Sequence, residues 1–435
     1  MDKKTQAVET SRELIGDEGF KNRHRKTEAM FTRLRCLPFA LVLIMVLRKS
    51  VKSLQCIVNE SMDGIGLDTV SASAYSQARY KLKHTAFIEL NQKAIVDVLY
   101  QDGNYKKYWG MRVLAVDGSK IRLPNTEDIC DAFGTIAYSQ GEGSEVQGKH
   151  PYALASVLHD VLNRISIDAV LARGDAYEVD LAIAHLAHTR PNDLLLFDRN
   201  YPSYRMLATC LQNERDFVMR CSAASFSVAR QMLKGEGADS QTVTLTPSAG
   251  QLPVIRAAGL PETLTVRFVR VLLSTGEFEV LVTSLLDEVL YSTHDFLELY
   301  GLRWGVETFY GLVKTRLTLE NFTGLGVEAV KQDFYATVYL SGLESILTGT
   351  AQALLDTKDT QHPQKVNRAV SFNALKTHAF ALLMGSLDTD VIIQKLTALF
   401  LQNPCLERKD RNTPRKKSSD TVLLNYHKRL KKQCF

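Results

Sequence analysis

Four side chains between residues 295 and 316 combine residue types and a spacing that could carry chemistry. Tyr300, Arg303, Glu307 and Lys314 stand at offsets of 0, 3, 7 and 14 along the chain. At about 100° per residue on a helix, these offsets fall within an arc of about 60°. Such a face could hold a metal ion at the carboxylate and phosphates at the two cations. A ladder of surface ion pairs has similar spacing, so the residues alone leave both interpretations open.

The segment around these side chains must also dock on a core. Its apolar residues fall on a stripe beside the polar one, and they are Leu302, Val306, Phe309, Tyr310 and Val313. We therefore expect residues 295–316 to form one helix that packs against the protein and still presents Glu307.

The spacing Y-x2-R-x3-E-x6-K resembles the YREK signature of the insertion sequence 4 family of DDE transposases. In that family the glutamate is the third catalytic carboxylate, and the other three residues hold transposon-end DNA. The resemblance implies these roles for Glu307 and for Tyr300, Arg303 and Lys314. It also suggests that Trp304, at the edge of the polar stripe, helps to accommodate a distorted DNA end. Core packing is the alternative for this tryptophan.

Two short apolar runs upstream each end in an aspartate. Residues 113–116 precede Asp117, and residues 194–197 precede Asp198. Carboxylates at strand ends are well placed to face a cleft, although a structural Asp-Gly turn is the alternative for Asp117. The run DRNYPSY resembles the family motif DRGYPS, with Asp198 as the second catalytic aspartate. Asn200 replaces the usual glycine, and asparagine is the next most tolerant residue where φ is positive.

The order of the expected elements defines the fold class. Strands at 113–116, 152–160 and 164–172, a helix at 178–188 and a strand at 194–197 give the α/β order of a ribonuclease H-like fold with a mixed sheet. In that fold the first and fourth strands are adjacent and parallel, about 5 Å apart, so Asp117 and Asp198 could hold one metal ion together. Asp198 and Glu307 are 109 positions apart, which is too far for a simple connection, and the alternating runs between them predict a β-rich insertion.

Five regions follow from this pattern. The first is a helical, basic region, residues 1–110. The catalytic core follows in two parts, residues 111–220 and 291–345, with the insertion between them at residues 221–290. The last is a helical region with a basic tail, residues 346–435. A helix over residues 71–92, capped by Ser71 or Ser73, carries Arg79, Lys81 and Lys83. Its AxSQARxKL run resembles the segment before the core in the same family, which implies binding of the transposon end. The C-terminal region can serve dimer contacts in that family.

Charge and composition fit a nucleic-acid enzyme. Residues 1–110 carry 18 Lys+Arg against 12 Asp+Glu and residues 407–435 carry 10 against 3, whereas the net charge of the chain is only +5. The ends are therefore basic and the middle is acidic, which suits phosphate binding around a carboxylate site. Seven cysteines lack C-x2-C spacing, and the apolar run 39–47 is too short to span a bilayer. We expect no membrane association and a bacterial-type cytoplasmic, nucleoid-associated protein.

The resemblance predicts a DNA transposase that cleaves at the terminal inverted repeats of its insertion sequence and transfers the 3′-OH ends to target DNA. Asp117, Asp198 and Glu307 would bind two Mg²⁺ ions, or Mn²⁺, which suit hard oxygen ligands. Synapsis of two ends implies a homodimer on DNA. The alternatives are a ribonuclease H-like endonuclease without strand transfer and a DNA-binding regulator derived from a transposase. A metallohydrolase site of His185 with Asp160 or Glu178 is a further rival, but structural histidines are the simpler interpretation.

Overall fold

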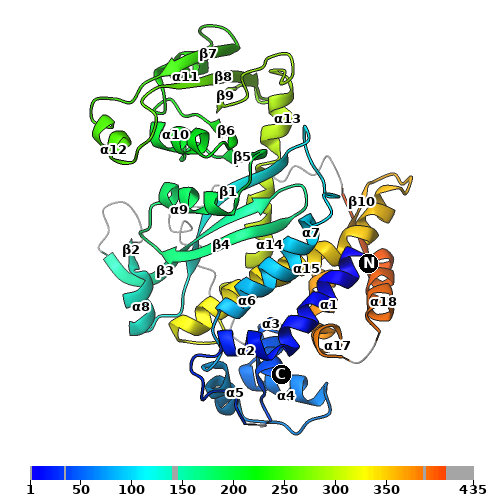
Figure 1. The fold of residues 1–435 in the computed structure, drawn as a ribbon. Helices are drawn as coiled ribbons and strands as arrows, with labels where there is room; N and C mark the ends of the chain where they lie inside the picture. The colour runs from blue at the N-terminus through cyan, green and yellow to red at the C-terminus, as the bar shows by residue number, and fades with distance from the viewer. Residues whose placement is uncertain (1, 34–35, 140–145, 386–387, 408–435) are drawn as a thin grey trace. The chain divides into compact units, whose positions relative to one another are not determined.

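The computed structural model describes residues 2–33, 36–139, 146–385 and 388–407 (Figure 1). Its contacts divide the chain into two compact units. Unit 1 consists of Met1–Asn104, Lys120–Ala153 and Gly311–Phe435, and unit 2 consists of Tyr105–Ser119 and Leu154–Tyr310. The predicted basic tail, residues 408–435, lies outside the described residues.

Unit 2 is built on a mixed β-sheet (Figure 1). The strand order is β3-β1-β5-β6-β9-β8-β7, and β4 also pairs with β3. The strands are β1 Arg112–Arg122, β3 Val146–Asp160, β4 Ile165–Arg173, β5 Asp193–Phe197, β6 Asp216–Arg220, β7 Ser240–Leu245, β8 Leu264–Leu272 and β9 Phe278–Thr283. The helices are α9 Glu178–His185, α10 Tyr204–Gln212, α11 Ser227–Leu233, α12 Leu252–Ala257 and α13 Asp295–Gly301.

The predicted ribonuclease H-like arrangement is confirmed. β1 lies between β3 and β5, and β5 runs parallel to both β1 and β6. The register of β1 against β5 begins at Arg112 opposite Asp193, where the two side chains form a buried bidentate ion pair with N···O distances of 2.7 and 2.5 Å. Because a slip by one residue would separate these charges inside the core, the pair helps to set the register.

The insertion after β6 is β-rich, as predicted, but it is not a separate sheet. β9 pairs antiparallel with β6, and β8 and β7 follow in antiparallel order, so the insertion continues the core sheet. Two helices of the insertion were not predicted: α11 lies before β7, and α12 lies between β7 and β8.

The first strand differs from its prediction. β1 has 11 residues and continues through Asp117 and Gly118, so Asp117 lies inside the strand rather than at its end. This excludes the Asp-Gly turn. Two elements that follow β1, α8 Glu127–Phe133 and β2 Thr135–Ser139, were missed, and β2 pairs antiparallel with the first half of β3.

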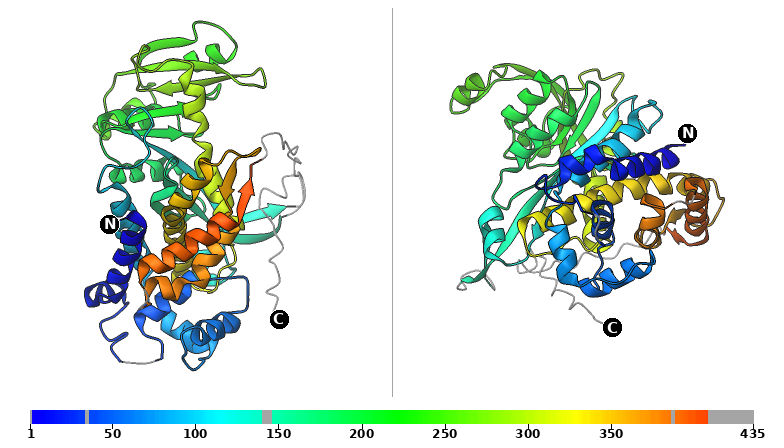
Figure 2. Two further views of the ribbon diagram at one scale, coloured as in Figure 1. Left: turned by 90° about the vertical axis from the view of Figure 1, so that its right-hand side faces the viewer. Right: turned by 60° about the horizontal axis from the view of Figure 1, so that its bottom comes forward.

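Unit 1 is mainly helical (Figure 2). Its central element is α15 Val327–Asp356, which is longer than the predicted helix and contacts α3, α6, α16 and α18. Besides α8 and β2, which are given above, unit 1 contains α1 Lys3–Gly16, α2 Glu18–His24, α3 Phe39–Leu47, α4 Leu54–Asp63, α5 Ala72–Arg79, α6 Thr85–Leu90, a π-helical turn Asn91–Asp97, α7 Val98–Tyr100, α16 Arg368–Thr377, α17 Ala379–Leu383, α18 Thr389–Gln402 and a two-stranded sheet of β10 Gln364–Val366 and β11 Pro404–Leu406. No helix in the described part of the chain is long and apolar enough to span a membrane.

Both helices that were expected to carry functional residues are interrupted. The helix predicted over residues 71–92 ends at Arg79 and resumes at Thr85, because residues 81–83 pair with the main chain of residues 24–26. Its N-cap is Ser71, one of the two residues that were predicted to cap it. The helix predicted over residues 295–316 is two helices, α13 and α14 Trp304–Thr315. Around the break, N–H groups bond three rather than four residues back, and Gly301 and Gly305 flank it.

Candidate active site

The parallel register of β1 and β5 brings the two predicted catalytic aspartates to neighbouring positions. Ala115 pairs with Leu196, so Asp117 and Asp198 each lie two residues beyond a paired position. The residues before them are fully buried, which anchors both strands in the core of unit 2. Asp198 directly follows the last residue of β5. The two carboxylates therefore leave the sheet from adjacent chains, about 5 Å apart at the backbone.

Asp117 is in an electrostatically unfavourable position. Burial is the main cause that raises the pKa of its carboxyl group to about 7. The charges of Asp198 and Glu307 contribute to this rise, and the Gly118 N–H and Arg303 act against it. The Gly118 N–H donates to Asp117 Oδ1 at 2.9 Å. Three acids thus lie close enough to repel one another, which is the condition that a divalent cation relieves.

Asp198 is held by the turn that follows β5. Its Oδ1 accepts a hydrogen bond from the Asn200 N–H at 2.7 Å. Asn200 is not among the described non-glycine residues with positive φ, so replacement of the family's glycine causes no backbone strain here.

Glu307, in the first turn of α14, pairs with an arginine in the turn that precedes this helix. Arg303 Nη2 lies 2.7 Å from Glu307 Oε1, and the side chain of Glu307 is 37% exposed whereas that of Arg303 is 4% exposed. The guanidinium also lies over the rings of Trp304, at 4.7 Å, and Tyr300, at 5.7 Å. Arg303 Nε is buried without a hydrogen-bond partner in the described protein. The ion pair is therefore only partly satisfied.

The acids do not form a preassembled ligand shell. Across residues 2–33, 36–139, 146–385 and 388–407, no group of three or more His, Cys, Asp or Glu side chains is arranged to hold a metal ion. The donor chemistry nevertheless fits Mg²⁺ or Mn²⁺, because the converging groups are carboxylates whose mutual repulsion raises the pKa of Asp117. In this structure Arg303 neutralises the charge of Glu307 through their ion pair.

The remaining residues of the signature have separate environments. The Tyr300 hydroxyl donates to the Phe197 carbonyl at 3.3 Å, which ties α13 to the end of β5. Trp304 is 46% exposed, so the core-packing alternative is wrong. Lys314 belongs to unit 1, where its ammonium group donates to the Lys120 carbonyl at 2.8 Å.

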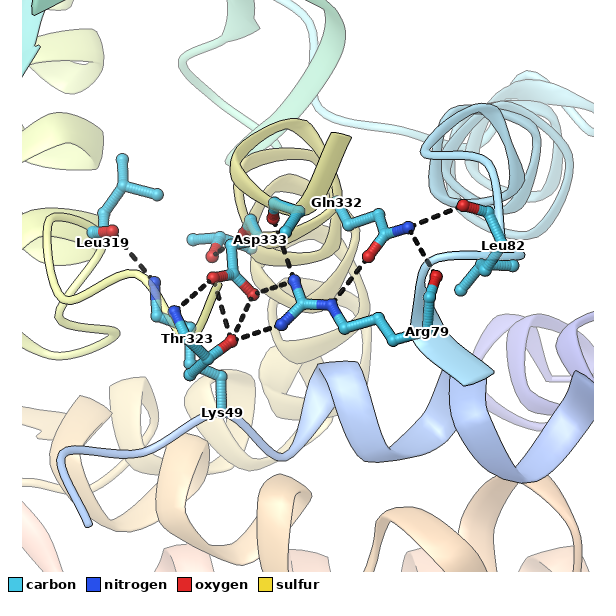
Figure 3. Close-up of polar contacts among 9 residues, drawn as sticks. Lys49, Arg79, Leu82, Leu319, Thr323, Gln332 and Asp333 are labelled. Atoms are coloured by element: carbon cyan, nitrogen blue, oxygen red, sulfur yellow. Dashed lines mark hydrogen bonds and ion pairs between the residues drawn. The ribbon is translucent and has the colours of Figure 1, made fainter. Parts of the chain in front are cut away.

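Arg79 has an internal role rather than a surface position (Figure 3). It is 4% exposed, and its nitrogens donate to Gln332, Thr323, the Ala329 carbonyl and Asp333 at 2.5 to 2.9 Å. The expectation that Arg79 contacts DNA is therefore replaced by a structural role: it joins α5 to α15. No local pattern distinguishes this arginine, because its partners lie about 250 residues away.

The two lysines beside it lie in the break between α5 and α6. Both are half-buried, and the Lys83 ammonium donates to the Arg23 carbonyl at 3.2 Å. No side-chain hydrogen bond of Lys81 is present in the described part of the chain, which leaves its ammonium group to solvent or a ligand.

His185, the centre of the alternative metallohydrolase site, belongs to a buried hydrogen-bond network. His185 Nδ1 lies 2.7 Å from Asp168 Oδ2, and its Nε2 lies 3.0 Å from Ser156 Oγ. This resembles a catalytic triad, but His185 is 0% and Ser156 1% exposed, and both side chains are already hydrogen-bonded within the protein, which indicates a structural network. Asp160 instead accepts hydrogen bonds from the turn after β3. His185 is therefore a structural histidine, in agreement with the simpler interpretation.

Sequence reasoning missed one group that holds the site. Tyr310, assigned only to the apolar stripe, is buried and its hydroxyl donates to the carbonyls of Asp117 and Ala155 at 3.1 and 2.8 Å. A tyrosine within an otherwise aliphatic stripe is a signal for such a bond, because a buried hydroxyl requires a partner.

Comparison with known proteins agrees with this geometry. Residues 108–340, just over half of the chain, match the family model described as "Transposase DDE domain". The chain belongs to this DDE transposase family. The matched range contains Asp117, Asp198 and Glu307 as well as the whole sheet of unit 2. Membership of the insertion sequence 4 group within the family remains a prediction.

Two individual similarities accompany the family match. A protein of Escherichia coli (strain K12) named "Putative transposase InsZ" is 27% identical over 187 residues, which cover 41% of this chain and 60% of that protein. The match thus spans less than two thirds of that relative. A cryo-EM structure of the piggyBac transposase synaptic complex with hairpin DNA is similar with a TM-score of 0.44 at 11% identity, covering 95% of this chain and 85% of that one.

Proposed function

We propose that this DDE transposase cleaves DNA at the terminal inverted repeats of its own element and transfers the freed 3′-OH ends to target DNA. The observation that carries the proposal is the β1–β5 register, which sets Asp117 beside Asp198 in a chain of this family. Glu307 acts on the same Asp117 carboxyl group, since its charge contributes to the raised pKa. A protein that only binds DNA has no need for three carboxylates that lie close enough to repel one another.

Asp117 and Asp198 are the proposed first metal ligands, and Glu307 is the third. When bound, two Mg²⁺ ions, or Mn²⁺, would supply an ionised nucleophile and stabilise the leaving oxygen of the phosphodiester. Asp117 and Asp198 leave adjacent strands, so they can share one cation without movement of the sheet. Tyr310 and the Arg112–Asp193 pair keep β1 in position beneath them.

Arg303 links DNA binding to this site. Its guanidinium is buried, stacks on Trp304 and has an unpaired Nε, so a DNA phosphate that approached it would be a stronger partner than the half-exposed Glu307 carboxylate. Transfer of Arg303 to a phosphate would release Glu307 toward Asp117. Site assembly would then depend on bound DNA.

The expected partner is DNA, at transposon ends and target, bound by a homodimer that brings two ends together. Beside Arg303, the proposed DNA contacts are Trp304, Lys314, Lys81 and Lys83. Their cationic or aromatic side chains suit phosphate binding and base stacking. Tyr300 was also expected to contact DNA, but it is buried and its hydroxyl is bonded to the Phe197 carbonyl, so it is not proposed as a contact.

A strand-transfer assay tests the function. The purified protein is incubated with Mg²⁺, a target plasmid and DNA that carries the inverted repeats bordering its gene. We expect joined products that disappear with Asp198→Asn. Cleavage without joining would instead indicate an endonuclease, and binding without either reaction would indicate a regulator; both results overturn the proposal.

A further inference from the structure

A buried hydroxyl without a partner lies beside the proposed catalytic acids. Tyr201 is 1% exposed, and its hydroxyl has no hydrogen-bond partner in the described protein. Its position is set by the turn after β5, since its N–H donates to the Asp198 carbonyl at 3.3 Å and its ring packs on Phe197 at 5.3 Å. A buried hydroxyl left unpaired is unfavourable, so a partner from outside the protein is expected.

The groups that surround this hydroxyl are acids. Burial raises the pKa of Tyr201, and the carboxylates of Glu178, Asp117 and Asp198 raise it further, while Arg303 lowers it. The phenol therefore stays protonated and can act as a hydrogen-bond donor toward this cluster.

Glu178 is a fourth acid in the same place. It is the first residue of α9 and is half-buried. A Cβ atom built on Gly118, next to Asp117, would lie 2.9 Å from Glu178 Oε1, so the carboxylate occupies the space that a side chain would take. Gly118 thus has a packing reason to be glycine. After burial, the charges of Asp117, Tyr201 and Glu178 also raise the pKa of Tyr310, whose hydroxyl donates to the Asp117 carbonyl at 3.1 Å.

We propose that Tyr201 and Glu178 orient the attacking oxygen of the reaction, a water molecule during cleavage and a DNA 3′-hydroxyl during joining. Before it is ionised, such an oxygen has both a proton to donate and lone pairs to accept. The Tyr201 hydroxyl is a donor and the Glu178 carboxylate an acceptor, so together they complement it. The role concerns orientation only, with no proton transfer to Glu178. This inference rests on the proposed function.

Single-turnover joining of a DNA end with a free 3′-hydroxyl, in Mg²⁺, tests the inference. Tyr201→Phe removes only the oxygen that has no partner, so we expect turnover to fall about 10- to 100-fold while the DNA dissociation constant stays constant and the melting temperature stays the same or rises. A purely structural tyrosine would give unchanged turnover. Turnover within twofold of the wild type would overturn the proposal.

The glutamate is tested by a graded pair. Glu178→Ala should reduce turnover about 100-fold, and Glu178→Gln, which keeps an acceptor oxygen, should recover part of the loss. Asp180→Asn is the matched control, because Asp180 lies on the same helix and pairs with the exposed Arg205. Equal turnover of Glu178→Ala and Asp180→Asn would contradict the role of Glu178.

The same assay separates this inference from the proposed function. Asp117→Asn is measured in parallel and should abolish joining. If Asp117→Asn is inactive while the Tyr201 and Glu178 variants are fully active, only the present inference fails. If Asp117→Asn keeps its activity, the proposed catalytic centre itself is wrong.

Discussion

Two arginine–carboxylate pairs, one in each unit, differ in how completely they are satisfied. In unit 1, Asp333 is 0% exposed and accepts bonds from Arg79 and Thr323, and every nitrogen of Arg79 has a partner (Figure 3). In unit 2, Glu307 is 37% exposed and Arg303 Nε is unpaired. In the first pair every guanidinium nitrogen is already bonded, whereas in the second an unbonded N–H is left and the carboxylate is exposed enough to exchange partners. Sequence charge alone does not distinguish them.

The largest expected effect is on catalysis. Glu307→Gln removes the proposed third metal ligand and should lower strand transfer by at least about 10³-fold, with little change in DNA affinity. Glu298→Gln, an exposed acid on α13, is the control and should behave as the wild type. A parallel loss of DNA binding and activity would count against the ligand role of Glu307.

The Arg79–Asp333 pair is expected to contribute more to the free energy of unfolding than the Arg303–Glu307 pair. Arg79→Met leaves Asp333 buried without its main counter-ion and should reduce the free energy of unfolding by about 3 to 5 kcal/mol. Arg303→Met should change it by less than about 1 kcal/mol, because its partner is more than a third exposed. Urea unfolding of both variants measures the difference, and equal losses would remove the distinction between the two pairs.

Unit 1 should also show a specific pH dependence of stability. Burial lowers the pKa of Lys49 and Lys376 to about 8, from the usual 10.5. Between these values the unfolded chain binds more protons than the folded protein, so their contribution to stability rises as the pH increases from about 8 to 10.5. The pH 10 minus pH 7.5 difference in unfolding free energy should be smaller in Lys49→Met than in the wild type, by about 1 to 3 kcal/mol. Lys358→Met, at an exposed position, should leave this difference unchanged.

The smallest effect concerns metal binding without DNA. Arg303→Met releases Glu307, so the DNA-free variant should bind Mn²⁺ several-fold more tightly by calorimetry. Arg199→Met removes an exposed positive charge next to Asp198 without touching that ion pair. If the two variants gain affinity equally, general charge rather than the release of Glu307 explains the effect.

Local patterns predicted the strands well because their residues are buried and apolar whatever their neighbours are. The runs before Asp117 and Asp198, and the parallel order that pairs them, follow from such patterns and from the limited set of α/β topologies. The break between α13 and α14 was missed because helical periodicity is almost unchanged by one tight turn. The extension of the sheet by the insertion was missed because pairing of β9 with β6 is not encoded in either strand alone.

The chain by itself determined which residues carry chemistry: the acids, the signature spacing and the apolar strands are local properties, and they were enough to indicate the DDE family. Only the tertiary structure decided which of these groups already have hydrogen-bond or ion-pair partners within the protein. Arg79 is hydrogen-bonded to partners about 250 residues away, and Glu307 forms an ion pair with Arg303. The Tyr201 hydroxyl has no hydrogen-bond partner in the described protein. The reason is that hydrogen-bond satisfaction and burial depend on distant segments, which residue type and spacing do not specify.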